Sequence, residues 1–154
     1  MPAIVPATAP ETIIHRDVAA ARAGREPRVL ARLASGWALF GGQQFVRGYL
    51  LLLPDPVVPQ LNSLAGAARA QFLADMTRLG DALLAATAAV RINYAIFGNV
   101  EPALHAHVIP RYADEPPALR TAQPWAYDWA QAASFDAAAF AELAAALRRE
   151  LDLR

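Results

Sequence analysis

The chain contains no cysteine and no lysine among its 154 residues. Without cysteine, disulfides, thiolate catalysis and cysteine-ligated zinc are all excluded. Without lysine, all 14 cationic residues are arginines, so any cationic side chain that contacts a phosphate must be a guanidinium. The formal net charge is zero, so the chain lacks the excess of basic residues that a large nucleic-acid interface requires. We therefore expect no nucleic-acid partner.

The chain also lacks a long hydrophobic segment. The longest apolar run covers residues 49–53, ends at Pro54 and is far too short to span a bilayer. Residues 1–12 have neither a basic region nor a continuous apolar stretch, so they do not have the pattern of a signal peptide. We expect a cytoplasmic protein with no membrane partner, and the length fits a single domain over residues 1–154.

Helical spacing of apolar residues, together with start and stop signals, predicts three helices. They cover about residues 11–23, residues 66–90 and about residues 137–151. Asp136 is the expected N-cap of the last helix, where Phe135 and Phe140 occupy the two positions of a hydrophobic staple.

Short apolar runs between these helices predict strands. They cover residues 37–40, 45–53, 92–97 and 105–111. The first two are separated by a glycine-containing connector, which is typical of an antiparallel hairpin. The stretch 113–134 contains three prolines and is expected to be irregular. Because strands and helices are segregated, the order favours an α+β fold with an antiparallel sheet of about five strands.

Two of the three histidines, His105 and His107, are two residues apart in a predicted strand. Alternate side chains of a strand share a face, so these imidazoles project together, about 6.5–7 Å apart along the strand. Histidine suits nucleophilic catalysis at phosphorus because it is partly neutral at physiological pH and forms a labile phosphoramidate. The pair is also compatible with a polar strand face, or with a metal site that takes a third ligand from His15 or a carboxylate.

Two blocks of sequence resemble the histidine-triad (HIT) superfamily. Residues 93–112, NYAIFGNVEPALHAHVIPRY, resemble its signature, in which a Gly-Gln pair precedes alternating histidines and a V-I-P-R ending. On that pattern His105 matches the middle, nucleophilic histidine and His107 the third, while Ala103 replaces the first. Residues 38–54, ALFGGQQFVRGYLLLLP, resemble the family's first hairpin, and a helix of the expected length joins the two blocks.

The resemblance implies an HIT-like fold with a core over residues 37–112, and a nucleotide hydrolase or nucleotidyl transferase that needs no cofactor. Within the family, the diadenosine polyphosphate hydrolases are the branch that the chain resembles. His105 Nε2 would attack the α-phosphorus of the nucleotide substrate, and the Ala103 carbonyl would accept from Nδ1. His107 and Asn99 would bind phosphate oxygens or assist the leaving group. The further candidates for substrate binding are Gly98, Arg111, Gln43 and Asn93.

The chain departs from the family pattern at four positions, one of which is Asn99 in place of the usual glutamine. Besides Ala103, Gly41 stands where many relatives have an Asn or Asp that binds the ribose, and Tyr49 replaces the histidine of the second strand. These changes affect nucleoside recognition more than the chemistry at phosphorus. They leave open a nucleotide-binding module with little turnover, or a metal-dependent hydrolase that uses the histidine pair.

Two further expectations concern the surface. The aromatic cluster Trp125, Tyr127 and Trp129 favours core or lid packing over a base-stacking platform. HIT relatives are commonly homodimers, so a second copy of the chain is an expected partner. Its interface would be an exposed sheet edge or the first helix.

Overall fold

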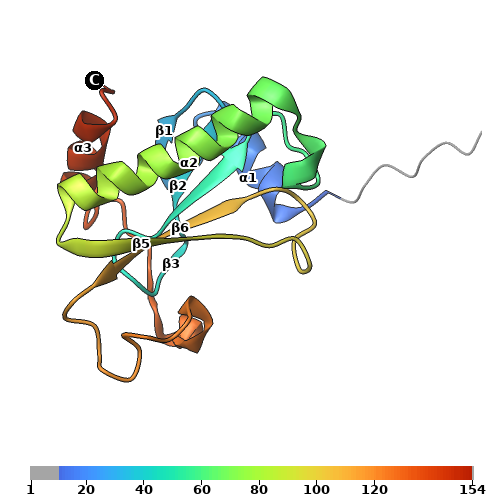
Figure 1. The fold of residues 1–154 in the computed structure, drawn as a ribbon. Helices are drawn as coiled ribbons and strands as arrows, with labels where there is room; N and C mark the ends of the chain where they lie inside the picture. Colours follow the sequence, from blue (N-terminus) through green and yellow to red (C-terminus); the bar gives the residue numbers. More distant parts are fainter. Residues whose placement is uncertain (1–10, 154) are drawn as a thin grey trace, which may run out of the picture.

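The computed structural model describes residues 11–153, and five of its strands form one antiparallel sheet in the order β1-β2-β4-β6-β5 (Figure 1). The strands are β1 (Val29–Arg32), β2 (Gly36–Phe40), β4 (Leu50–Pro54), β6 (Ala106–Tyr112) and β5 (Ala89–Ile96). A separate pair joins β3 (Gln43–Gln44) to β7 (Ala133–Ser134). The helices are α1 (Ile13–Arg22), α2 (Gly66–Ala86) and α3 (Ala141–Glu150). The predicted α+β class and the five-stranded antiparallel sheet are confirmed.

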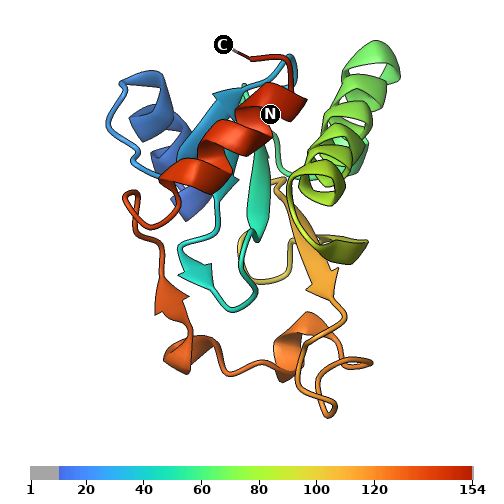
Figure 2. The same cartoon turned by 90° about the vertical axis from the view of Figure 1, so that its left-hand side faces the viewer.

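One face of the sheet forms the main core with α2 and α3, which lie on the same side of it (Figure 2). Alternation along the strands turns one set of apolar side chains toward these helices. The sheet contributes Ala38, Phe40, Leu50, Leu52, Ala106 and Val108, and the helices contribute Phe72, Leu79, Leu83, Leu143 and Leu147. The two helices thus cover one face of the paired strands β4 and β6. This packing holds the strands in place and so positions the side chains on their opposite face.

Among the described residues, two further apolar clusters lie on the opposite face of the sheet. At one end, Ile14 and Val18 of α1 pack with Ala103 and strand residues in a second apolar cluster. At the other end, the segment after β6 packs Tyr127 and Trp129 against a third cluster that includes Ile109. Both histidines of the pair lie in the chain between Ala103 of the second cluster and Ile109 of the third. Within residues 11–153 no helix is long and apolar enough to cross a membrane.

The predicted helix boundaries needed correction where tertiary contacts decide them. The first helix starts at Ile13, because Thr12 caps it and forms a capping box with His15. The long helix ends at Ala86 instead of residue 90, since Ala89 already pairs with Tyr112 in the sheet.

The C-terminal helix also starts later than predicted. Asp136 accepts hydrogen bonds from Ala138 N and Ala139 N at 2.8 and 3.0 Å, but the turn that it caps precedes the helix, which begins at Ala141. The expected contact between Phe135 and Phe140 is present, with ring centroids 5.3 Å apart.

The predicted strand over residues 45–53 was wrong in its first half. Only β4 (Leu50–Pro54) belongs to the main sheet, where it pairs with β2 as the predicted hairpin requires. Before it the chain turns, and Gly48 has φ of +91°, a conformation that favours glycine. The short edge strand β1 (Val29–Arg32) was not predicted, because four residues carry too little periodicity to be detected.

Candidate active site

The histidine pair lies at the start of β6 and faces a cavity of about 450 Å³. His105 directly precedes the strand and His107 is its second residue, with ring centroids 5.0 Å apart and planes at 70°. The side chains share one face, as predicted. The cavity is lined by Phe97, Asn99, Val100, Glu101, His105, His107 and Trp125.

His105 is held in one orientation by the backbone. Its Nδ1 lies 2.7 Å from the carbonyl oxygen of Ala103, and the side chain is buried. A carbonyl oxygen can only accept, so Nδ1 carries the proton of this hydrogen bond. In the neutral ring the lone pair is then on Nε2, the atom that a nucleophilic attack requires. The hydrogen bond expected from the sequence is present although the first histidine of the triad is replaced by alanine.

His107 is held by Tyr49, which directly precedes the neighbouring strand β4. The tyrosine hydroxyl lies 2.6 Å from His107 Nδ1, and the two rings are nearly parallel, with centroids 5.8 Å apart. Burial, with a smaller contribution from nearby His105, lowers the pKa of His107 to about 4. Burial also raises the pKa of Tyr49 well above its usual value. At neutral pH the pair therefore consists of a neutral imidazole and a protonated phenol.

These protonation states favour opposite tautomers in the two histidines. Among the described residues the Tyr49 hydroxyl has no other hydrogen-bond partner, so donation to His107 Nδ1 is what satisfies its proton. His107 then carries its own proton on Nε2. His105 thus offers a lone pair and His107 a hydrogen-bond donor from alternate positions at the start of β6.

Gly41 and Tyr49 are matched to each other by shape. A Cβ atom built at Gly41 would overlap the Tyr49 ring, so the tyrosine fills the space that a side chain at position 41 would need. Gln44 fixes the loop between them, since its Nε2 donates to the carbonyls of Gly41 and Tyr49 at 2.8 and 2.9 Å. The two departures from the family pattern at these positions are therefore one coupled change.

Two aromatic side chains that the sequence did not assign to the site form a wall of the cavity. Phe97 and Trp125 are 45% and 49% exposed, and their rings meet edge to face at 4.9 Å. Each ring centroid is 6.3 Å from that of His107. Behind them, Trp129 stacks on Trp125 at 6.4 Å and contacts Phe45 at 4.0 Å. The expected packing role fits Trp129, whereas Trp125 faces the cavity.

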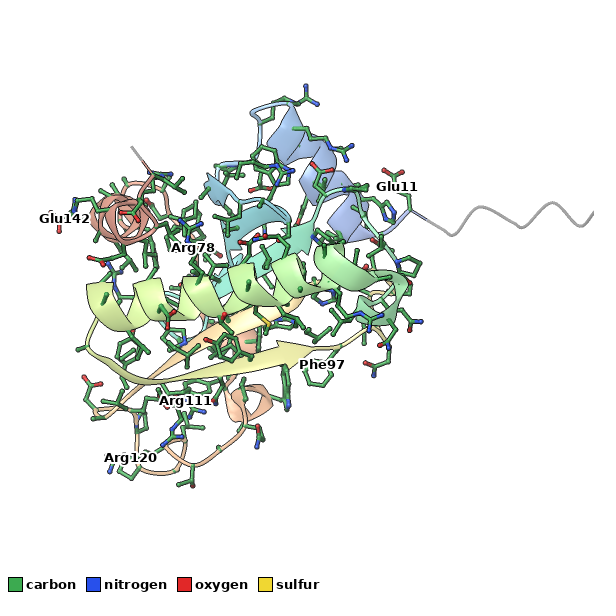
Figure 3. All side chains as sticks on the ribbon, turned by 45° about the horizontal axis from the view of Figure 1, so that its top comes forward. Glu11, Arg78, Phe97, Arg111, Arg120 and Glu142 are labelled. Atoms are coloured by element: carbon green, nitrogen blue, oxygen red, sulfur yellow. The ribbon has the colours of Figure 1, made fainter. Side chains whose placement is uncertain are left out.

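Only part of the predicted set of site residues comes together. His105, His107 and Asn99 line the cavity, and Gly98 lines a separate pocket beside it. Gln43 is exposed on β3. The last two predicted residues, Asn93 and Arg111, line a different pocket further along β5 and β6. Figure 3 shows Arg111 close to Arg120 and well away from Phe97 at the end of β5.

Arg111, a predicted substrate-binding residue, has its guanidinium bound within the protein. It is buried, forms a 2.7 Å ion pair with Glu115 and donates to the carbonyls of Leu119 and Ala122. Burial opposes ionisation of Glu115, but hydrogen bonds from Arg111, Tyr112 N and Tyr127 outweigh it and lower the pKa of the carboxyl. Arg111 therefore holds together the segment that leads to Trp125.

A metal site would need a third ligand beside the histidine pair. His15 does not supply it, because its Nδ1 accepts from Thr12 N at 3.2 Å and its side chain is not part of the cavity lining. In the part of the chain that the structure describes, no three His, Cys, Asp or Glu side chains are grouped so that they could hold an ion.

The HIT domain family matches residues 38–114, which is half of the chain. The chain therefore belongs to the HIT domain family, whose members are generally nucleotide hydrolases and transferases. This confirms the resemblance at the level of the family. A comparison with curated proteins gives no significant match.

Solved structures of histidine-triad proteins have the same fold. A histidine triad protein from Bradyrhizobium japonicum is 24% identical with a TM-score of 0.72, and the match covers 94% of this chain and 98% of that one. One from Sinorhizobium meliloti is 21% identical with a TM-score of 0.69 and coverages of 84% and 93%. A hypothetical histidine triad nucleotide-binding protein from Sulfolobus tokodaii is 14% identical, with a TM-score of 0.69 and coverages of 89% and 91%. At these identities the similarity establishes the HIT-like fold.

Proposed function

We propose that this protein is a nucleotide hydrolase that works through a nucleotidyl-His105 intermediate. Its substrate would be a dinucleoside polyphosphate or a related conjugate with a phosphoanhydride or phosphoramidate bond, which places it near the diadenosine polyphosphate hydrolases. The observation that carries this proposal is the 2.7 Å hydrogen bond between His105 Nδ1 and the Ala103 carbonyl. With the proton on Nδ1, the lone pair of the neutral ring is on Nε2, where it can attack phosphorus. This holds although Ala103 replaces the first histidine of the triad. The cytoplasmic location stays a prediction.

The chemistry needs two displacements at phosphorus. In the first, the lone pair of His105 Nε2 forms a bond to the α-phosphorus, and the bond from phosphorus to the leaving oxygen or nitrogen breaks. The electron pair of that bond goes to the leaving group, and a leaving amine takes a proton from water. In the second, water attacks the same phosphorus and the bond to Nε2 breaks. The water loses a proton to solvent, the nucleoside monophosphate leaves and His105 is restored.

His107 and Asn99 would stabilise the charge that develops on phosphate oxygens. His107 donates from Nε2 because Tyr49 occupies its Nδ1, and a fixed donor in a partly buried site stabilises developing charge without reorganising. Asn99 is exposed at the cavity and adds a neutral amide donor. Neither group has to change its protonation state during the reaction.

The test is turnover of diadenosine tetraphosphate and of adenosine 5′-phosphoramidate by the parent protein and a His105→Asn variant, with products resolved by chromatography. Asn retains a hydrogen-bond donor toward Ala103 but has no atom at the Nε2 position. We expect AMP from the parent and none from the variant. His15→Asn is the matched control, because it replaces a histidine outside the cavity. Equal turnover by the parent and His105→Asn would disprove the mechanism.

A second candidate is a nucleotide-binding module with little turnover. It is favoured by Ala103, which leaves the first position of the triad without an imidazole. Long incubation of the folded protein with the same two nucleotides separates the candidates. Binding measured by calorimetry, with the ligand recovered unchanged, would support the binding module and contradict the hydrolase.

We infer that the protein forms a homodimer through strand β5 (Ala89–Ile96). This strand is an edge of the five-stranded sheet and is eight residues long, so it presents unpaired backbone groups along its free side. Its Val90 is 63% exposed, and Leu84 of the adjacent helix is 44% exposed. Sedimentation equilibrium should show a dimer that Val90→Arg dissociates. A monomeric parent protein at micromolar concentration would exclude this interface.

A further inference from the structure

The aromatic wall of the cavity has the geometry of a binding surface. Phe97 and Trp125 meet at 77°, so their rings form a corner, and both are about half exposed while most aromatic side chains of the clusters behind them are more buried. Trp129, stacked on Trp125 at an interplanar angle of 13°, supports the corner from behind. A flat ring entering this corner would stack on one member and meet the other edge-on, the two arrangements that aromatic pairs prefer.

The corner lies on the side of His107 that suits a leaving group. The ring of His107 is 5.0 Å from that of His105 and 6.3 Å from each ring of the corner. Among the described residues, no ring contact joins His105 to Phe97 or Trp125. Displacement at phosphorus expels the leaving group roughly in line with and opposite to the nucleophile. A phosphate attacked by His105 and bound by His107 therefore directs its leaving group toward the corner.

The charges of the lining also restrict the leaving group. The residues that line the cavity include no arginine, and the single carboxylate among them is Glu101. A polyphosphate leaving group would bring several negative charges next to this carboxylate with no cationic side chain in the lining to neutralise them. An uncharged aromatic group, or one attached through an amine, meets no such repulsion.

We propose that Phe97 and Trp125 form a subsite for a leaving group that carries a planar aromatic ring, attached to the phosphorus through nitrogen or oxygen. This inference rests on the proposed function, since it takes His105 as the nucleophile. Among the substrates of the proposed function, it favours nucleoside monophosphates conjugated to an aromatic amine or alcohol over dinucleoside polyphosphates. The ring stacks in the corner while the bond to phosphorus breaks, and the aromatic product then leaves from the open side of the cavity.

The test compares two adenosine 5′-phosphoramidates that differ only in the ring of the amine, 2-phenylethylamine and 2-cyclohexylethylamine. The two amines have similar size and apolar area, so the ratio of their kcat/KM values reports stacking. We expect the parent protein to prefer the phenyl compound by about 10-fold, in the range of stacking on a single aromatic side chain. Trp125→Ala should bring the ratio to about one. Because both compounds are measured on the same variant, a general loss of activity cancels.

Three further measurements decide the outcome. Trp37→Phe is the control, since its indole lies outside the cavity lining, and it should keep the parent ratio. Adenosine and uridine versions of the phenyl compound are compared next. If Trp125→Ala changes the choice between bases and leaves the amine ratio intact, the corner binds the nucleobase and the proposal is wrong. If no amidate is hydrolysed, calorimetry of both compounds on the His105→Asn protein still tests the subsite apart from the proposed function. Equal affinities there would overturn it.

Discussion

The ring of Tyr49 fills the space directly in front of Gly41, so these two residues form one structural unit across the turn between β2 and β4. In the family pattern that the sequence resembles, many relatives have an Asn or Asp at the position of Gly41, and the second strand has a histidine at the position of Tyr49. Here the glycine admits the larger ring, and the ring in turn carries the hydroxyl that binds His107. Tyr49 thus both excludes a side chain from position 41 and supports the second histidine.

Gly41→Asn should destabilise the protein by about 1–3 kcal/mol, the cost of forcing extra atoms into a packed site. The same substitution in a Tyr49→His background should cost less, because the smaller ring vacates the space. Urea unfolding of the four proteins gives a double-mutant cycle, in which we expect a coupling energy of about 1 kcal/mol. Strictly additive costs would show that the two positions are independent.

Tyr49→Phe keeps the ring and removes the hydroxyl from His107. We expect stability to fall by about 1 kcal/mol and kcat/KM by about 10-fold, because a buried acceptor loses its partner and the imidazole loses its fixed tautomer. Long-range ¹⁵N–¹H NMR of the ring should show Nε2–H alone in the parent and a mixture of tautomers in the variant. Tyr112→Phe is the control, since its hydroxyl donates to the Arg47 carbonyl outside the cavity. An unchanged tautomer in Tyr49→Phe would refute the positioning role.

Stability should depend on pH through His107. Its pKa is about 4 in the folded protein and 6.5 in an unperturbed imidazole, so the unfolded chain binds more protons between these values. The free energy of unfolding must then fall as the pH drops from 6.5 toward 4. Carboxyl groups with lowered pKa values, such as Glu115, also lose stabilisation at low pH, so the measurement is the difference from His107→Gln. We expect a smaller slope in the variant; equal slopes would mean that burial of His107 is not the cause.

Restoring the first histidine of the triad should not improve this protein. Ala103 is 1% exposed and packs with Ile14 and Leu39 beneath α1. Ala103→His should therefore destabilise the fold by about 1–3 kcal/mol through overpacking, with no gain in turnover, because the backbone carbonyl already orients His105. Ala85→His on the exposed side of α2 is the control for adding an imidazole. A stable Ala103→His protein with faster turnover would show that the missing side chain limits the chemistry.

Much of the fold could be predicted from sequence, because its long elements have clear periodicity. The long helix and the strand that carries the histidines were predicted with small errors at their ends. Two of the errors lie at turns: Asp136 caps a turn that also looks like a helix start, and the run over residues 45–53 contains a turn at Gly48 that apolar composition conceals. Such choices depend on tertiary contacts that a single sequence does not display.

Only the part of the candidate site that is formed by residues close together in the sequence could be predicted. His105, His107 and the Ala103 carbonyl lie within five residues, so strand alternation brings them together. The contact between Tyr49 and His107 spans 58 residues and depends on the pairing of β4 with β6. The corner of Phe97 and Trp125 depends on how the irregular segment after β6 folds back, for which no periodic signal exists.

The last prediction tests whether Arg111 stabilises the fold or binds substrate. Arg111→Gln should lower the free energy of unfolding by about 2–3 kcal/mol, because it leaves the buried Glu115 carboxylate without its cationic partner. Arg91→Gln, at the exposed cross-strand neighbour, should change it by less than about 0.5 kcal/mol. Both values come from urea unfolding.

Glu115→Gln completes the test, because it breaks the same ion pair from the other side. If Arg111 acts only through this pair, the two single variants should be similarly destabilised, and the double variant should be little worse than either. Their KM values at a temperature where all are folded should then move together. A substrate contact would instead raise KM in Arg111→Gln alone and leave Glu115→Gln near the parent value. That result would show that Arg111 binds substrate, as the sequence predicted.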